Sequence, residues 1–289
     1  MRNLLHISDI HFGPHFLPEV AAGVMALVEE RRPDLVVISG DLTQRAKPKQ
    51  FQDAREWVDR LPVPTLAVPG NHDVPMYRVW ERLFTPYGAY RRHFAEDLEP
   101  TYEDDSLFVV GVNTAFNWTV KDGRVTAAGL GRLADLLAGA PGGKLKVVVA
   151  HHHLIPPPRF DTRRLTVRAA EAVELLARME VDLVLSGHLH QTWIGTTEEF
   201  YPSGRDPVIL LHTGTTTSGR GRGWERKRNS CNWIQVEDDH LEVRHLLWRP
   251  EQAQFFEWSR HRFARRHLSP FSLSTQGGRS HPPENGHRP

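Results

Sequence analysis

The sequence predicts an α/β fold, a four-layer α/β/β/α sandwich with two mixed sheets and a small helical cap. Short apolar runs rich in β-branched residues alternate with stretches of helical spacing between the amino terminus and Trp193. Such alternation is typical of layered α/β proteins. Beyond Trp193 the pattern changes to strands joined by turns, and these strands are expected to complete the second sheet.

The elements follow from the spacing of apolar residues along the chain. The predicted buried strands are Leu4–Ser8, Leu35–Ser39, Pro64–Val68, Leu107–Val112, Leu145–Ala150 and Leu183–Ser186. The predicted helices are Pro18–Glu30, Pro48–Arg60, Leu130–Ala138 and Val167–Met179. The later strands are Pro207–Thr213, Cys231–Glu237 and Leu241–Trp248. Residues 76–98, rich in aromatic residues and arginine, suit cap helices lying over a site rather than under a sheet.

The chain is expected to form one main domain over residues 1–250, followed by a carboxyl-terminal segment over 251–289. This segment begins with a short predicted helix that carries Phe255, Phe256, Trp258 and Phe263. The composition that follows, rich in Ser, Pro, Gly and Arg, cannot build a core and predicts a disordered tail. The aromatic residues of the helix either dock on the core or make a weak contact with a membrane surface.

Bulk composition excludes several classes of protein. The formal net charge is +1, which gives no strong signal for a nucleic-acid partner. Cys231 is the single cysteine, so an internal disulfide and a thiolate metal site are excluded. Apolar runs fall short of the roughly 18 residues that span a bilayer, and the amino terminus begins with a strand pattern. A soluble, cytoplasmic protein is expected, whereas its oligomeric state is not predicted.

Polar residues that can bind metal follow five of the predicted strands. The five segments are Asp9-Ile10-His11, Gly40-Asp41, Gly70-Asn71-His72-Asp73, His151-His152-His153 and Gly187-His188-Leu189-His190. The carboxyl ends of strands in an open α/β layer meet along one edge, so these segments can converge. Alternation within a strand end would point residues i and i+2 to the same face, which explains the Asp-x-His and His-x-His spacings.

The set of candidate ligands is too large for one tetrahedral ion. The seven candidates are Asp9, His11, Asp41, Asn71, one residue of the histidine triplet, His188 and His190. Two divalent cations about 3.5–4 Å apart, as in sites that clamp both ends of a phosphoryl displacement, fit that number. Imidazole and carboxylate together favour manganese, iron or zinc over calcium.

These blocks, in this order, resemble the calcineurin-like metallophosphoesterase superfamily, and the resemblance spans roughly residues 4–215. It is greatest to the bacterial single-domain enzymes named as cyclic-nucleotide phosphodiesterases. The resemblance implies that Asp9, His11 and His190 bind a first metal ion and that Asn71, His151 and His188 bind a second. Asp41 would bridge the two ions, and a hydroxide between them would attack phosphorus.

The resemblance also implies roles for two residues that are not ligands. His72 would contact the phosphate and assist the leaving oxygen, and Asp73 would orient the imidazole ring of His72. The family more often has His-His-Pro at the fourth block, so the register of the histidine triplet is open. His151 is preferred over His152 because it comes first after the strand.

Three arginines are candidates for substrate binding. Arg45 could project toward a substrate phosphate, although an arginine just before a helix is more often a surface residue. Arg220 and Arg222 lie in a basic loop after Thr213-Gly214-Thr215. This loop either attracts an anionic substrate or is a solvated run of charge.

The leading functional hypothesis is a phosphodiesterase that hydrolyses a small phosphodiester such as a cyclic nucleotide. A second hypothesis is hydrolysis of a lipid-linked nucleotide pyrophosphate, of the UDP-diacylglucosamine type, which the aromatic and basic carboxyl-terminal segment supports. The third is a binding module that keeps the fold without catalysis. This third hypothesis is least favoured, because such modules lose ligands and this chain has all seven together with His72.

Overall fold

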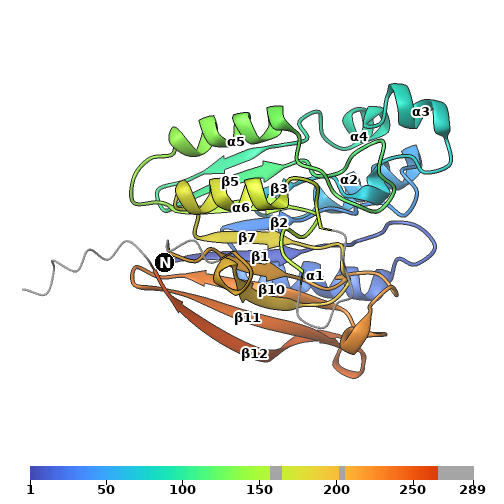
Figure 1. Cartoon of the computed structure of the whole chain (residues 1–289). Helices are drawn as coiled ribbons and strands as arrows, with labels where there is room; N and C mark the ends of the chain where they lie inside the picture. The colour runs from blue at the N-terminus through green and yellow to red at the C-terminus, as the bar shows by residue number, and fades with distance from the viewer. Residues whose placement is uncertain (157–164, 202–205, 266–289) are drawn as a thin grey trace, which may run out of the picture.

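Two six-stranded mixed sheets pack face to face and carry helices on their outer surfaces (Figure 1). The structure is a computed structural model that describes residues 1–156, 165–201 and 206–265. The first sheet contains β1 (Arg2–Ile7), β2 (Leu35–Ile38), β3 (Thr65–Ala67), β10 (Ser230–Val236), β11 (His240–Arg249) and β12 (Gln254–Ala264). The second contains β4 (Thr101–Glu103), β5 (Leu107–Val112), β6 (Leu145–Ala150), β7 (Leu183–Ser186), β8 (Trp193–Thr196) and β9 (Ile209–His212).

The first sheet has parallel strands at one end and antiparallel strands at the other, whereas the second has parallel strands between two antiparallel edge strands. The order in the first sheet is β12-β11-β10-β1-β2-β3, with β1, β2 and β3 parallel to one another. The order in the second is β4-β5-β6-β7-β9-β8, with β5, β6, β7 and β9 parallel. The carboxyl ends of neighbouring parallel strands therefore lie at a common edge in each sheet.

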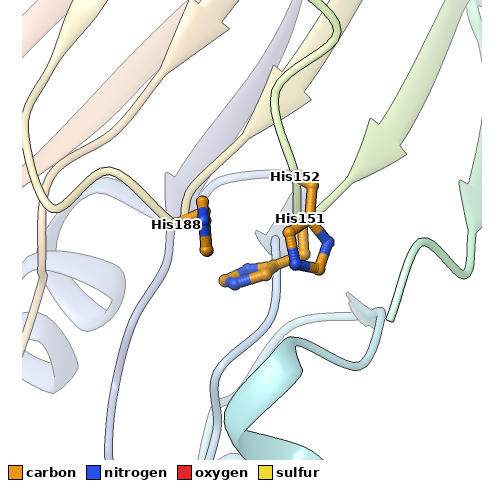
Figure 2. A group of neighbouring side chains, drawn as sticks. All are labelled: His151, His152 and His188. Atoms are coloured by element: carbon orange, nitrogen blue, oxygen red, sulfur yellow. The ribbon is translucent and has the colours of Figure 1, made fainter. Parts of the chain in front are cut away.

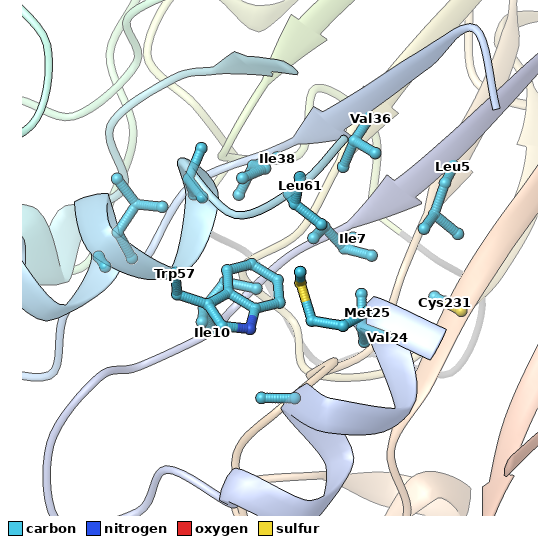
Figure 3. Packing of buried hydrophobic residues seen from close by; sticks show 14 of the residues in the cluster. Leu5, Ile7, Ile10, Val24, Met25, Val36, Ile38, Trp57, Leu61 and Cys231 are labelled. Carbon is cyan, nitrogen blue, oxygen red and sulfur yellow. The ribbon is translucent and has the colours of Figure 1, made fainter. Parts of the chain in front are cut away.

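Side-chain alternation along the central strands divides the core into three layers. In β2, Leu35 and Val37 face the core between the sheets, whereas Val36 and Ile38 face the helices. The helix-side core of the first sheet packs Met25 and Trp57 against these strands (Figure 3). A separate core packs helices against the second sheet. This arrangement confirms the predicted four-layer sandwich.

The helices agree with the predicted spacing to within a few residues. They are α1 (Pro18–Arg31), α2 (Pro48–Val58), α5 (Ala127–Ala138) and α6 (Ala169–Arg178). Proline occupies the first turn of α1 and α2, where its missing N–H group costs no hydrogen bond. Two short helices, α3 (Val79–Phe84) and α4 (Gly88–His93), form the cap predicted for residues 76–98. No helix in the described part of the chain is long and apolar enough to cross a bilayer.

The prediction of a helix from about Gln252 was wrong, because this segment is the edge strand β12 and pairs with β11. Phe255 lies opposite Trp248 and Phe263 opposite Leu241. Aromatic residues favour a pleated surface, and cross-strand pairing outweighs the helical spacing of the four rings. The first sheet therefore continues past residue 250 without a boundary. The predicted disordered tail lies beyond Arg265, outside the described residues.

The assignment of the late strands to one sheet was also wrong. Of these strands, β9 joins the second sheet, whereas β10 and β11 extend the first sheet from β1. Apolar alternation predicts that a strand has one buried face, but it does not identify the neighbouring strand. The short strands β4 and β8 were not predicted, because three or four residues carry too little periodicity.

Candidate metal centre

All seven candidate ligands lie just beyond the carboxyl ends of parallel strands. Asp9 and His11 follow β1, and Asp41 follows β2. Asn71 begins a single 3-10 turn after β3. The remaining histidines follow β6 and β7 in the other sheet; they are His151, His188 and His190. The ligands that follow strands of the first sheet contact those that follow strands of the second, so the carboxyl ends of both sets of strands meet at one site.

One group of ligand atoms comes from Asp9, His11, Asp41 and His190, all of which are buried. His190 Nε2 lies 3.0 Å from Asp9 Oδ1 and 3.3 Å from His11 Nε2. His11 Nε2 also lies 3.6 Å from Asp41 Oδ2. Asp9 Oδ1 and Asp41 Oδ2 are buried without a hydrogen-bond donor among the described residues. Buried carboxylate oxygens without donors, facing two imidazole nitrogens, fit a divalent cation.

A second group of ligand atoms surrounds the side chain of Asn71. Asn71 Oδ1 lies 3.2 Å from His151 Nε2 and 3.0 Å from His188 Nδ1. His151 Nε2 also lies 3.4 Å from Asp41 Oδ1. Asp41 therefore directs one carboxylate oxygen toward each group, which is the position of a bridging ligand.

The histidine triplet presents two rings close to His188, and Figure 2 shows His151 and His152 beside it. His151 Nδ1 donates to the Ser39 carbonyl oxygen at 2.8 Å, which leaves Nε2 free to face Asn71. The Nδ1 atom of His152 is hydrogen-bonded to Thr114 Oγ1 at 2.8 Å. A carbonyl partner on the far ring nitrogen is typical of a ligating histidine. These contacts support His151 as the ligand.

The backbone at the site differs from the extended strand ends that the spacing predicted. Five of the candidate ligands have positive φ angles: Asp9 (53°), His11 (55°), Asp41 (54°), His188 (70°) and His190 (55°). Residues other than glycine adopt this left-handed region rarely, and strained backbone of this kind is concentrated at functional sites. His188 and His190 belong to different groups of ligand atoms. Strand alternation was therefore the wrong reason for the His-x-His spacing.

Two glycines leave room for the side chains of the centre. Gly40 has φ of 100°, and a Cβ there would lie 2.6 Å from His151 Nδ1. A Cβ at Gly70 would overlap Asp41 Oδ1 and the Asp41 backbone nitrogen. The Gly-Asp and Gly-Asn-His-Asp blocks thus need glycine because the chain approaches the Asp41 and His151 side chains closely.

Gly70→Ala is expected to weaken metal binding by about tenfold or more, because the Asp41 carboxylate must move away from the new methyl group. Titration calorimetry with Mn²⁺ measures the effect. Gly131→Ala is the matched control, since a Cβ at Gly131 has no atom within 4 Å. Wild-type affinity in the Gly70 variant would contradict this packing argument.

Burial and charge interactions together favour the protonation states that a cation needs at Asp9, Asp41, His11 and His188, but not at His151. Burial opposes ionisation of Asp9 and Asp41, but nearby histidines outweigh it and hold both pKa values well below the usual range. Burial lowers the pKa of His11 to about 4 and also holds the pKa of His188 low. Burial would lower the pKa of His151 as well, yet Asp41 raises it to about 9. A cation would therefore compete with a proton at His151.

His72 lies beside the centre without belonging to either group of ligand atoms. Its Nδ1 atom is 3.0 Å from the Gln44 carbonyl oxygen, which accepts a hydrogen bond from the ring. Its Nε2 atom is 3.2 Å from Arg220 Nη1. The ring stands edge-on to that of His11, with centroids 4.9 Å apart. His72 thus presents Nε2 next to an arginine at the edge of the metal centre.

The predicted role of Asp73 as the residue that orients His72 was wrong. Its carboxylate accepts hydrogen bonds from the backbone nitrogens of Gly70, Leu42 and Thr43 and from Thr43 Oγ1. These bonds join the loop after β2 to the loop after β3. Asp73 therefore braces the backbone that carries Asp41 and Asn71, and the Gln44 carbonyl holds the His72 ring. Backbone contacts of this kind leave no signal in the sequence.

A cavity of about 260 Å³ opens beside the centre and has a cationic wall. All three predicted substrate residues line it, namely Arg45, Arg220 and Arg222. Arg220 Nη1 reaches the metal centre, 3.3 Å from both His11 Nε2 and Gln44 Oε1. The Arg45 guanidinium stacks 4.9 Å from the Tyr77 ring centroid and donates to the Tyr77 hydroxyl at 2.9 Å.

Sequence reasoning missed several residues of this cavity. They are Gln44, Val74, Met76, Tyr77, Arg82, Val120 and Lys121. Gln44, Met76 and Tyr77 lie close in sequence to the metal-binding motifs, so their positions could have predicted that they line the cavity. Val120 and Lys121 lie in a loop that is far from every motif in the sequence, and only the fold brings them to the cavity.

The two-sheet sandwich and this site define a metallophosphoesterase. The chain belongs to the calcineurin-like phosphoesterase family, whose sequence profile matches residues 2–192. The structure is similar to that of purple acid phosphatase PPD1 from yellow lupin seeds, with a TM-score of 0.67 and 12% identity. That similarity covers 91% of this chain and 53% of the lupin protein and concerns the fold alone.

Two curated bacterial relatives are phosphodiesterases by name. The chain is 33% identical over 177 residues to a probable cyclic nucleotide phosphodiesterase of Synechococcus sp., which is 60% of this chain and 64% of the relative. It is 39% identical over 80 residues to the glycerophosphodiester phosphodiesterase GpdQ of Enterobacter lignolyticus, which is 24% of this chain and 29% of the relative. The chain thus spans less than two thirds of the length of these two relatives.

Proposed function

We propose that the protein is a metal-dependent phosphodiesterase that hydrolyses a small phosphodiester such as a cyclic nucleotide. The observation that carries this proposal is the position of Asp41, whose two carboxylate oxygens face two separate groups of ligand atoms. Paired cations with a shared carboxylate suit in-line displacement at phosphorus. The names of the relatives support a diester as the substrate class.

The proposed ligands divide between the two groups. Asp9, His11 and His190 would hold one cation, and Asn71, His151 and His188 the other, with Asp41 shared. Nitrogen and oxygen donors together suit manganese, iron or zinc. Cations bound there supply Lewis-acid polarisation of the phosphoryl group and a nucleophile at neutral pH.

The chain's own residues bind and orient the diester. Arg220 lies between His72 and His11, where its guanidinium can neutralise a phosphate oxygen. Arg45, fixed against Tyr77, offers a second cation at the cavity wall. The hydrogen bond from Nδ1 to the Gln44 carbonyl oxygen orients the His72 ring beside Arg220 in the cavity, where Nε2 would contact the substrate phosphate and its departing oxygen.

His72→Gln is expected to lower kcat by about 10²-fold or more, with the metal content unchanged, because the side chain contacts the reacting phosphate rather than a cation. Steady-state kinetics on bis(nitrophenyl) phosphate and elemental analysis measure the two effects. His261→Gln, on the exposed part of β12, is the control. A parallel loss of metal and activity would instead make His72 a ligand.

A panel of substrates tests the proposed class. Cyclic nucleotides, a glycerophosphodiester, bis(nitrophenyl) phosphate, nitrophenyl phosphate and a lipid-linked nucleotide pyrophosphate are compared by kcat/KM with the same metal-loaded enzyme. We expect the small diesters to be preferred. Preference for the monoester would overturn the diesterase proposal, and preference for the pyrophosphate would favour the second hypothesis. No hydrolysis of any substrate would favour a non-catalytic binding module.

The lipid-linked pyrophosphate hypothesis loses part of its original support. It relied on an aromatic carboxyl-terminal helix, and those aromatic residues lie in β12. Phe255 is buried, and Phe263 packs against the core between the sheets. The kcat/KM values measured with the substrate panel therefore test this hypothesis.

A further inference from the structure

Large apolar side chains are exposed together on the cap and on the loop beside it. Seven of the twelve large apolar side chains exposed in the described part of the chain belong to this one surface. We name it the cap patch, and its members are Met76, Tyr77, Val79, Trp80, Phe84, Trp118 and Val120. Trp80, Phe84 and Trp118 are the most exposed, at 75%, 74% and 72%. Apolar patches of this kind mark surfaces that contact a partner.

Arg82 joins the two segments of the cap patch into one structural unit. Its guanidinium, buried under α3, donates to the Pro75 carbonyl oxygen at 2.9 Å and to the carbonyl oxygen of Thr119. Asn71 Nδ2 donates to the Val120 carbonyl oxygen at 3.4 Å, which connects the same loop to the metal centre. The patch is thus built on an ordered scaffold rather than on an independent loop.

The aromatic rings of α3 point away from the core. Trp80 and Phe84, one helical turn apart, stack on each other with ring centroids 5.9 Å apart and an interplanar angle of 10°. Both rings nevertheless remain about three-quarters exposed, so this stacking hides little apolar area from water. Transfer of these two exposed rings from water into an apolar phase would be favourable, because it removes apolar surface from water.

The charge around the cap patch is positive. On the cap itself Arg82 is buried and Arg78 pairs with Glu81, so the positive charge comes from the cavity wall beside it, which carries Arg220 and Arg222. Lys121 and Arg45 add positive charge at the cavity mouth, where they meet Met76, Tyr77 and Val120. A second copy docked through the same surface would bring like charges together, which opposes association. An anionic lipid surface attracts this charge and accepts tryptophan and tyrosine at its interface.

We propose that the cap patch is a membrane-binding surface that docks on anionic lipid bilayers, with the mouth of the metal cavity at the interface. Tyr77 and Val120 belong both to the patch and to the cavity wall, so docking would present the cavity to phosphodiesters at the lipid surface. Aromatic insertion together with basic side chains provides the two signals that stable peripheral binding needs. This surface is independent of which diester the enzyme hydrolyses.

Co-sedimentation with vesicles tests the proposal. The intact chain is mixed with vesicles of phosphatidylcholine alone or of equimolar phosphatidylcholine and phosphatidylglycerol. The double variant Trp80→Ser/Phe84→Ser is compared with Trp258→Ser, which removes an exposed tryptophan (55%) from β12. We expect wild type and Trp258→Ser to bind the anionic vesicles, and to bind them less tightly at high salt. The double variant should bind at least about tenfold more weakly than wild type.

Hydrolysis of bis(nitrophenyl) phosphate without vesicles is the fold control, and it should be unchanged in the double variant because neither ring lines the cavity. Sedimentation velocity reports self-association. Equal vesicle binding by the double variant, or loss of binding in Trp258→Ser alone, would overturn the proposal. A wild-type dimer that the double variant dissociates, with no vesicle binding, would overturn it in favour of a second copy as the occupant.

Discussion

Asp41→Asn is expected to reduce diester hydrolysis by about 10³-fold or more, because one carboxylate serves both groups of ligand atoms. Asparagine keeps the size of the side chain, but it replaces one oxygen by an amide nitrogen that cannot bind a cation. The bound metal per chain should therefore fall together with kcat. Elemental analysis and steady-state kinetics on the same preparation measure both quantities.

The control for Asp41→Asn is Asp105→Asn, which alters a fully exposed carboxylate far from the proposed ligands in the sequence. Thermal unfolding of both variants distinguishes loss of the site from loss of the fold. Full hydrolysis by a folded Asp41→Asn protein would rule out the shared carboxylate.

Removal of metal by a chelator, followed by dialysis, is expected to lower hydrolysis to the level of the Asp41 variant. Re-addition of Mn²⁺, Fe²⁺ or Zn²⁺ should restore activity, because hydrogen bonds tie the loops that carry the ligands to one another and across the two sheets. The order of restoration among the metals identifies the preferred ion. Circular dichroism before and after treatment checks that the chain stays folded.

The chelation experiment also has a result that would contradict the prediction. A metal-free preparation that hydrolyses the diester at the original rate would remove metal from the mechanism altogether. Ca²⁺ is the matched negative control, since it prefers oxygen ligands only and this site offers several imidazole nitrogens.

The central strands and main helices are predictable because their signals are local and strong. Leu35–Ile38 is a continuous buried apolar run, and α1 begins at a proline. Partnership between strands is not local, which explains the wrong sheet for β10 and β11. In β12, helical spacing and strand propensity conflicted, and pairing with β11 decided the outcome.

The candidate ligands are predictable as a set because five short motifs follow five strands. Their local geometry is not predictable, since the left-handed conformations of Asp9 and His188 depend on the surrounding loops. The role of Asp73 and the hydrogen bond from His72 to Gln44 involve backbone atoms, which are the same in every residue. The cap patch required the fold, because it brings Trp118 beside the cap.

Anomalous diffraction from crystals soaked in Mn²⁺ tests the central claim most directly. Two peaks are expected on either side of the Asp41 carboxylate, one among Asp9, His11 and His190 and the other among Asn71, His151 and His188. A single peak, or peaks away from Asp41, would contradict the shared centre proposed for this enzyme.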